Sequence, residues 1–300
     1  MTTVYLPTRF KRTTINFILE DIINEDLHPK SDEFTFDFSR LTFIEPAAIT
    51  LLSNLFEWLL HNDVKVYIDL PDKYGDKPNC PIKFLDDSLF FKEYLEKPLY
   101  EDPHPRVTTL PLTKVHYTNS QQWIDNNFKP WLARRLDVHV SRLDTISMCI
   151  GEVFNNIVDH TDTEIGSVFA QHYPQTDCIK ICVADFGIGI AKNIQEKYDA
   201  NLTDREALIL SIKEGFTTQD TPRNRGAGLA TLVKNIVTQN KGAVCIMSNS
   251  GILSNKIHSE AGIIATDSYS YYPGTFIEIV LNTTNIEQIL DHEEEFEWEF

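Results

Sequence analysis

Residues 141–161, SRLDTISMCIGEVFNNIVDHT, constrain the fold of this 300-residue chain more than any other stretch. The stretch has no proline, and its apolar residues recur at steps of three and four, which predicts a helix with one buried face. That face comprises Leu143, Ile146, Ile150, Val153, Phe154 and Ile157. The other face carries Glu152, Asn156 and His160 at steps of four, so a carboxylate, a carboxamide and an imidazole line up along the helix. Such a row is typical of a solvated surface, and only the sequence downstream gives it a chemical meaning.

Three short glycine-containing motifs follow this predicted helix. DFGIG at 185–189 comes directly after the apolar run 179–184, where a predicted strand ends in a loop. NRGAGL at 224–229 opens a helix predicted over 230–237, and GT at 274–275 opens a strand predicted over 276–281. Each motif alone is a weak signal, because short glycine patterns occur by chance in many loops.

Taken in order, E-x-x-x-N at 152–156 and the motifs D-x-G-x-G, G-x-G-L and G-T resemble the ATP-binding domain of the GHKL superfamily. That superfamily includes histidine kinases, anti-sigma-factor serine kinases and the ATPase domains of gyrase and MutL. The resemblance covers residues 107–285 and implies the Bergerat fold, an α/β sandwich in which helices cover a mixed sheet. It also implies that the chain binds ATP and Mg²⁺.

The resemblance assigns a chemical role to the polar motif residues. Glu152 would be the general base, accepting a proton from a water or a substrate hydroxyl. Asn156 would be a ligand of magnesium and so part of the ATP site, because Mg²⁺ prefers oxygen ligands and keeps several waters. Asp185 would accept a hydrogen bond from the adenine amino group, and Thr275 would complete that network through water.

The glycine motifs would contact the nucleotide through their backbones. Gly187 and Gly189 permit backbone angles and a close approach that a side chain would block. Gly226 and Gly228 would do the same at the phosphates, where the helix that begins near Leu229 points its N-terminal amides.

Some residues near these motifs keep two interpretations or depart from the superfamily pattern. Arg225 would neutralise a phosphate charge or lie exposed, and His160 would order the lid or end the helix with a hydrogen bond. In the segment IKEGFTT, which resembles the box before the lid of sensor kinases, Lys213 and Gly215 replace the usual phenylalanine and proline. Ala230 stands where many members have a further glycine. These departures concern lid closure more than the adenine pocket.

The first hundred residues alternate predicted helices and strands, which indicates an α/β layer with partly parallel strands. The helices are expected over 13–23, 47–61 and 82–95, and the strands over 33–38 and 64–70. Within this part, DFSRLTFIEPAA at 37–48 resembles a STAS domain, the fold of anti-sigma-factor antagonists. Pro46 or Ala47 fills the phospho-acceptor position, so the resemblance implies the fold without the phosphoswitch. An ordinary βα unit of another α/β fold is the alternative.

The chain is therefore predicted to contain a STAS-like α/β domain at 1–100 and a GHKL ATP-binding domain at 107–285. The sequence YEDPHPR at 100–106, with two prolines, reads as the linker between them. The second domain is expected to use strands 107–117, 243–248 and 275–281, a helix at 119–136, and a hairpin formed by 166–172 and 179–184. Residues 251–273 have no predicted place. Residues 286–300 form an acidic, aromatic tail, interpreted as a solvated segment or a partner motif.

The charge balance argues against two classes of partner, although a local basic patch would still be compatible with it. The chain has 27 basic and 44 acidic residues, a net charge of −17, which disfavours non-specific binding to nucleic acid or to an anionic membrane. No signal peptide and no apolar run long enough to cross a bilayer is apparent. Five cysteines without a C-x-x-C pair indicate reduced, structural thiols and a cytoplasmic location.

Two functional classes follow from the motifs. The first is an ATP-binding signalling or regulatory protein with a histidine-kinase-like domain, acting as a Mg²⁺-dependent ATPase or as a Ser/Thr kinase of the anti-sigma-factor type. The second is a nucleotide-gated interaction module with little or no turnover. Both imply a protein partner or substrate and allow a homodimer. An orthodox sensor histidine kinase is disfavoured, because the region 107–136 offers only His116, in a predicted strand.

Overall fold

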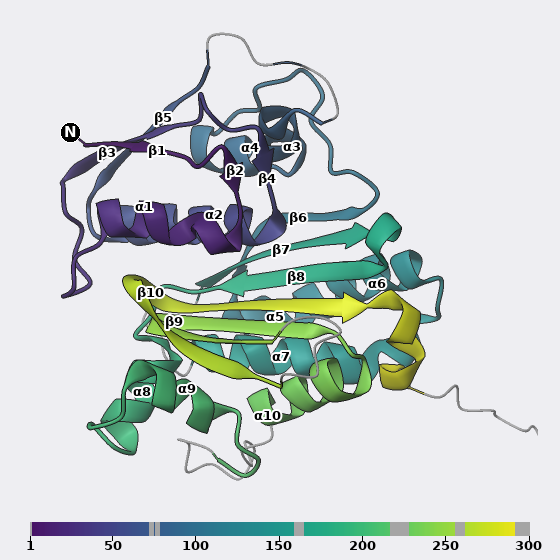
Figure 1. The fold of residues 1–300 in the computed structure, drawn as a ribbon. Helices are drawn as coiled ribbons and strands as arrows, with labels where there is room; N and C mark the ends of the chain where they lie inside the picture. The colour runs from purple at the N-terminus through teal and green to yellow at the C-terminus, as the bar shows by residue number, and fades with distance from the viewer. Residues whose placement is uncertain are drawn as a thin grey trace, which may run out of the picture.

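The computed structural model describes residues 2–71, 75, 79–158, 165–216, 228–255 and 262–291. In this part of the chain a three-stranded sheet, a two-stranded sheet and a five-stranded sheet are layered with helices (Figure 1). The chain therefore belongs to the α/β class, as the sequence predicts.

The first hundred residues form a parallel layer. Strands β1 (Thr2–Tyr5), β3 (Glu33–Asp37) and β5 (Lys65–Asp69) pair in the order β1-β3-β5, and all these pairings are parallel. The short strands β2 (Arg9–Phe10) and β4 (Phe43–Ile44) form a second parallel pair. The helical elements are η1 (Arg12–Thr14), α1 (Ile15–Ile22), α2 (Pro46–His61), α3 (Pro81–Asp87) and α4 (Phe90–Leu95). The expected parallel strands are confirmed, and the STAS-like fold stays a prediction.

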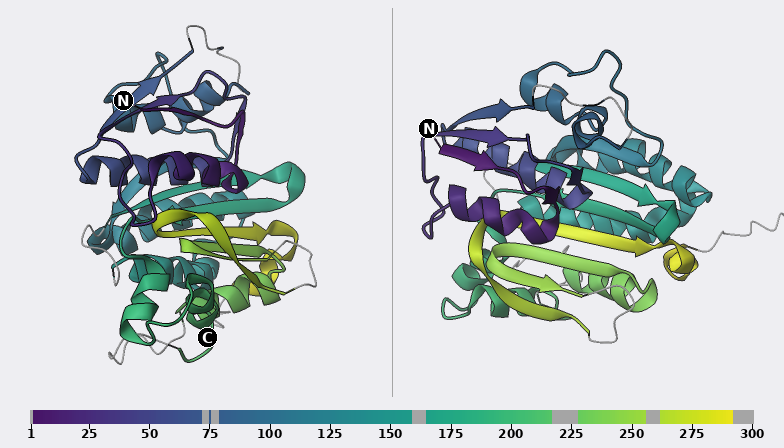
Figure 2. Two further views of the ribbon diagram at one scale, coloured as in Figure 1. Left: turned by 60° about the vertical axis from the view of Figure 1, so that its left-hand side comes forward. Right: turned by 45° about the horizontal axis from the view of Figure 1, so that its top comes forward.

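Helix α2 is buried on nearly all sides. Its first residue is Pro46, whose fixed φ suits the first helical turn. The helix lies between the three-stranded and the five-stranded sheets, together with α1 (Figures 1 and 2). A helix covered on both sides must be apolar all round, and even Ser53 and Asn54 within it are buried.

The predicted helix 82–95 is two helices in the structure. Helix α3 ends at Asp87 and helix α4 begins at Phe90. Between them Leu89 has a φ of 68°, in the left-handed region, which an α-helix of L-residues cannot accommodate. The apolar periodicity continues across this break, so the pattern alone does not reveal it.

The second sheet is antiparallel throughout, which corrects the mixed sheet that the resemblance implied. Strands β6 (Thr109–His116), β7 (Ile165–Tyr173), β8 (Cys178–Ala184), β10 (Ile264–Asn282) and β9 (Ala243–Ser254) lie in the order β6-β7-β8-β10-β9. Every neighbouring pair is antiparallel. The hairpin β7–β8, with η5 (Pro174–Thr176) at its turn, is confirmed. The described part of residues 251–273, which had no predicted place, extends β9 and β10 into a second, longer hairpin.

Helices cover the face of this sheet that lies away from α1 and α2 (Figure 1). They are η2 (Tyr117–Asn119), α5 (Ser120–Trp123), η3 (Ile124–Phe128), α6 (Lys129–Leu136), η4 (Val140–Leu143), α7 (Asp144–Val158), α8 (Gly189–Lys197), α9 (Asp204–Ser211), α10 (Gly228–Val233) and η6 (Lys234–Gln239), with η7 (Thr283–Ile289) following β10. Helix α7 confirms the predicted helix as far as Val158, and its predicted end lies outside the described residues. The predicted helix 119–136 contains a π-helical stretch, η3, just before Pro130. Proline has no N–H and its ring clashes with a preceding carbonyl, so the hydrogen-bond pattern widens there.

Two apolar clusters fill the space on the two faces of the five-stranded sheet. One packs the helices of the second half against the sheet, with Val153 and Phe154 of α7 among its buried members. The other joins the core of the first hundred residues to the opposite face of the sheet, where Phe169, Tyr272 and Phe276 take part. The first hundred residues are thus fixed to the second half by a shared core, and both faces of the sheet are covered.

Two further features of the described residues concern membrane-spanning helices and the state of the cysteines. None of the helices in the described ranges is both long and apolar enough to cross a membrane. All five cysteines are free thiols, and four of them are buried.

Candidate functional site

Asp185 directly follows the last residue of strand β8 and lies beside Thr275 of strand β10. Ala184 pairs with Phe276 across the two strands, and the next residues are joined by a hydrogen bond from the Asp185 N–H to the Thr275 carbonyl, 2.8 Å long. One oxygen of the Asp185 carboxylate accepts the N–H of Gly187 at 2.8 Å. The structure therefore brings together the D-x-G-x-G and G-T motifs, which are about ninety residues apart in the chain.

The Asp185 carboxyl group is almost completely buried, with an exposed fraction of 1%. Burial raises its pKa from 3.8 to about 7, because the charged form loses its hydration. Hydrogen bonds from Gly187 and from Thr275 favour the charged form and limit the rise. The result is a carboxyl group that changes its charge near neutral pH, a property that is typical of functional sites.

Two hydroxyl groups of the sheet bind the first turn of helix α8. The Thr275 hydroxyl accepts the N–H of Ile190 at 3.2 Å, and the Ser248 hydroxyl accepts the N–H of Ala191 at 3.2 Å. Thr275 and Ser248 are partners across β10 and β9, so both hydroxyls come from one register position. Free N–H groups at a helix start need such acceptors, which explains how the loop after Asp185 is held to the sheet.

Two glycines of this region occupy positions that no other residue would fit. Gly189 has a φ of 80° and Gly274 has a φ of 89°, both in the region that favours glycine. A Cβ atom on Gly274 would overlap the carbonyl oxygen of Asp185, and one on Gly189 would overlap the Ser248 hydroxyl. The glycines thus let the loop, β10 and β9 approach each other closely around the carboxyl group.

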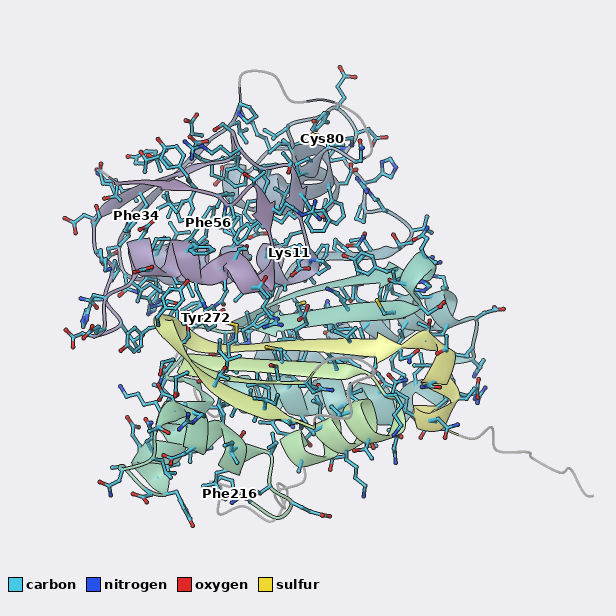
Figure 3. The ribbon with its side chains drawn as sticks, viewed as in Figure 1. Lys11, Phe34, Phe56, Cys80, Phe216 and Tyr272 are labelled. Atoms are coloured by element: carbon cyan, nitrogen blue, oxygen red, sulfur yellow. The ribbon has the colours of Figure 1, made fainter. Side chains whose placement is uncertain are left out.

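The sequence motifs missed two residues that hold Asp185 from the other side. The amide nitrogen of Asn54 donates to the carbonyl oxygen of Asp185 at 2.7 Å and to the hydroxyl oxygen of Tyr272 at 2.6 Å. Asn54 belongs to α2, and Tyr272, labelled in Figure 3, lies where β10 bends. His61, at the end of α2, also contacts Phe186, with ring centroids 5.6 Å apart. The one available signal is that the polar Asn54 interrupts the apolar run 46–60.

Glu152 and Gly228, from two other motifs, are also adjacent. A Cβ atom added to Gly228 would lie 2.8 Å from a carboxylate oxygen of Glu152, so only glycine allows this approach without displacement of the carboxylate. Leu229 is buried in the cluster that joins α10 to α7 and so anchors the start of α10. The carboxylate predicted as the base therefore faces the glycine predicted to approach the phosphates.

Four predicted residues cannot be placed in the same way. The Asn156 backbone belongs to α7, but its side chain is outside the described part, and His160, Arg225 and Gly226 lie outside the described residues altogether. Within the described ranges, no group of three or more His, Cys, Asp or Glu side chains is arranged to hold a metal ion. A magnesium site built from one carboxamide, phosphate oxygens and waters needs no such group, so this observation and the predicted role of Asn156 are compatible.

No protein-family model, curated protein or solved structure matches the chain.

Proposed function

We propose that the chain is an ATP-binding signalling protein with a histidine-kinase-like domain, and that it is a Mg²⁺-dependent ATPase or a Ser/Thr protein kinase of the anti-sigma-factor type. The observation that carries the proposal is the buried Asp185 carboxyl group, held by Gly187 and Thr275 at the end of β8. A buried carboxylate is a selective acceptor for an exocyclic amino group, and adenine has one at the position where guanine has a carbonyl.

The loop that covers Asp185 must move for a base to reach the carboxylate, since the side chain is only 1% exposed. Gly187 belongs to this loop and Gly189 begins α8 directly after it, and small residues at such positions absorb the change in backbone angles. The hydrogen bond from Gly187 would then open, and the amino group of the base would take the place of the Gly187 N–H on the carboxylate.

The phosphate end of the proposed site combines Glu152 with the start of α10. In this proposal the Glu152 carboxylate, which lies close to Gly228, would accept the proton of a hydroxyl or a water attacking the terminal phosphate, and the close contact supports this role. Asn156 stands one turn further along α7 and would hold Mg²⁺, which neutralises the charge of the phosphates when bound. Glu152 itself would position the nucleophile and accept its proton.

The alternative, a nucleotide-gated interaction module, is favoured by one observation. Asn54 of helix α2 donates a hydrogen bond to Asp185, at the start of the loop. Displacement of the loop would therefore disturb the contacts of α2 in the first hundred residues. This coupling suits a protein that reports the bound nucleotide to a partner, with or without hydrolysis.

We expect the protein to bind ATP with Mg²⁺ at least tenfold more tightly than GTP. GTP would direct a carbonyl oxygen at the Asp185 carboxylate, and two acceptors facing each other in a buried site lose a hydrogen bond and repel. Isothermal titration calorimetry with both nucleotides, at pH 8 and with excess Mg²⁺, measures the difference. Equal affinities would remove Asp185 from the adenine position.

We also expect that incubation with ATP adds no phosphate within residues 33–60. Pro46 and Ala47 have no hydroxyl, and the nearest candidate, Thr50, is fully buried and donates its hydroxyl to the Pro46 carbonyl at 3.1 Å. Peptide mass mapping after incubation with ATP and Mg²⁺ tests this, and a phosphopeptide containing Thr50 would show that α2 opens.

A further inference from the structure

A separate cavity of about 180 Å³ lies where the first hundred residues meet the edge of the five-stranded sheet. Three aromatic rings line it, Phe43, Phe84 and Tyr173, together with Arg106 and Gln171. Ser167, the partner of Ala184 next to the Asp185 loop, is four residues before Gln171 along β7. The cavity is therefore about 13 Å along the strand from the proposed ATP site.

Each ring of the cavity has a cation over it. The Arg9 guanidinium lies 4.6 Å and the Lys11 ammonium 5.8 Å from the centroid of Phe43. Lys11 is labelled in Figure 3, in the region where the first hundred residues meet the five-stranded sheet. A cation in such a position is attracted to the ring, because the face of an aromatic ring carries partial negative charge.

The other two rings are arranged in the same way. The Arg106 guanidinium lies 4.7 Å from the centroid of Phe84, and the Lys180 ammonium lies 5.9 Å from the centroid of Tyr173. A ligand group that enters the cavity between the rings would therefore contact aromatic surface inside it and positive charge at its rim.

The acidic side chains nearby do not balance this charge. Lys180 pairs with Glu45 and Glu278, and Arg12 pairs with Glu278. Asp87 is shared between Lys83 and Arg106. Among the described residues, no acidic side chain forms an ion pair with Arg9 or Lys11. Among the described residues that make these contacts, the six cations Arg9, Lys11, Arg12, Lys83, Arg106 and Lys180 outnumber their three ion-pair partners, Glu45, Asp87 and Glu278.

This excess is unusual in a chain whose net charge is −17. The protein as a whole repels anions, but the cations at the rim of this cavity would attract a negatively charged group locally. Arginine in particular pairs well with carboxylates.

The size of the cavity narrows the class of ligand. Pockets for small molecules commonly measure about 300–1,000 Å³, whereas this one, at about 180 Å³, suits a single ring. We propose that the cavity docks an acidic peptide segment of a partner protein, with one aromatic side chain inserted between the rings and flanking carboxylates on Arg9, Lys11 and Arg106. This docking site is independent of the proposed ATP site.

A fluorescein-labelled peptide, Glu-Glu-Glu-Phe-Glu-Glu-Glu, tests the proposal by fluorescence anisotropy with the full chain at low ionic strength. The double substitution Arg9→Glu and Lys11→Glu should weaken binding at least tenfold. The control is Lys192→Glu with Lys197→Glu, which changes the net charge equally at exposed positions of α8 and should weaken binding less than threefold. Replacing the phenylalanine of the peptide by alanine should also weaken binding at least tenfold. If the charge reversal impairs folding of the protein, the double substitution Arg9→Gln and Lys11→Gln replaces it in the same measurement.

Three results would overturn the proposal. Equal weakening by both double variants would show that only the overall charge matters. Equal binding of the peptide without phenylalanine would show that the cavity is not used. Binding that appears only after deletion of residues 292–300 would assign the cavity to the chain's own acidic segment rather than to a partner. None of these results depends on ATP binding.

Discussion

Glu152→Gln is expected to lower the rate of ATP turnover by a factor of about 10²–10⁴, the usual contribution of a general base, while ATP affinity changes little. The reason is that the carboxylate acts on the attacking hydroxyl or water rather than on the nucleotide. Glutamine has nearly the same shape, so the contact of residue 152 with Gly228 is preserved. Phosphate release under single-turnover conditions and calorimetry with ATP measure the two quantities separately.

Two further variants make the experiment specific. Glu196→Gln, on the exposed side of α8, removes the same charge away from the proposed phosphate end and should leave turnover unchanged. Asn156→Ala should instead abolish Mg²⁺-dependent ATP binding, since it removes the proposed metal ligand. If Glu152→Gln and Asn156→Ala weaken ATP binding equally, the two residues share a structural role. A wild-type protein that binds ATP without turnover, even with a partner, would favour the interaction module.

Local periodicity was sufficient to predict the elements whose neighbours in the fold are also neighbours in the chain. Helix α7 and the hairpin β7–β8 agree with their patterns to within a few residues. What the patterns did not contain was pairing between distant strands. Strand β10 lies between β8 and β9, and its register shifts twice near Tyr272, which only contacts across the sheet determine. The mixed sheet that the family resemblance implied is wrong, since every neighbouring pair of this sheet is antiparallel.

The same distinction applies to the candidate site. Asp185, Gly189 and Thr275 were recognisable, because each belongs to a short motif at the start or end of an element. Asn54 and Ser248 belong to no such motif, since they contribute their hydrogen bonds from elements far away in the sequence. Their positions result from the packing of α2 on one face of the sheet and from the pairing of β9 with β10.

Asp185→Asn is expected to have opposite effects on ATP binding and on stability at pH 8. ATP binding should weaken by about 1–3 kcal/mol, because a charge-assisted hydrogen bond to the adenine amino group is lost. The unliganded protein should become more stable by about 1–3 kcal/mol, because burial of a charged carboxylate is relieved. The upper limit of this gain in stability is about 4 kcal/mol, which follows from the difference between a pKa of 3.8 in the unfolded chain and about 7 in the folded protein.

The pH dependence gives the sign of the effect on stability. A carboxyl group whose pKa is higher in the folded protein binds its proton more tightly there, so its stabilisation is complete below pH 3.8 and disappears as the pH rises through about 7. The gain from Asp185→Asn should accordingly be largest at pH 8 and fall to less than half of that value at pH 5, which is about one unit above the unfolded pKa. Urea unfolding at the two pH values measures it, with Asp177→Asn at an exposed turn as the matched control.

ATP affinity should show the reverse dependence, since the charged carboxylate accepts a hydrogen bond better than the neutral acid. Phosphate groups also titrate near pH 6, so the informative quantity is the ratio of the affinities of the wild type and Asp185→Asn. This ratio should increase between pH 5.5 and pH 8 and become constant above it. A constant ratio together with the predicted gain in stability would mean that Asp185 is a buried, strained carboxyl group that ATP does not contact.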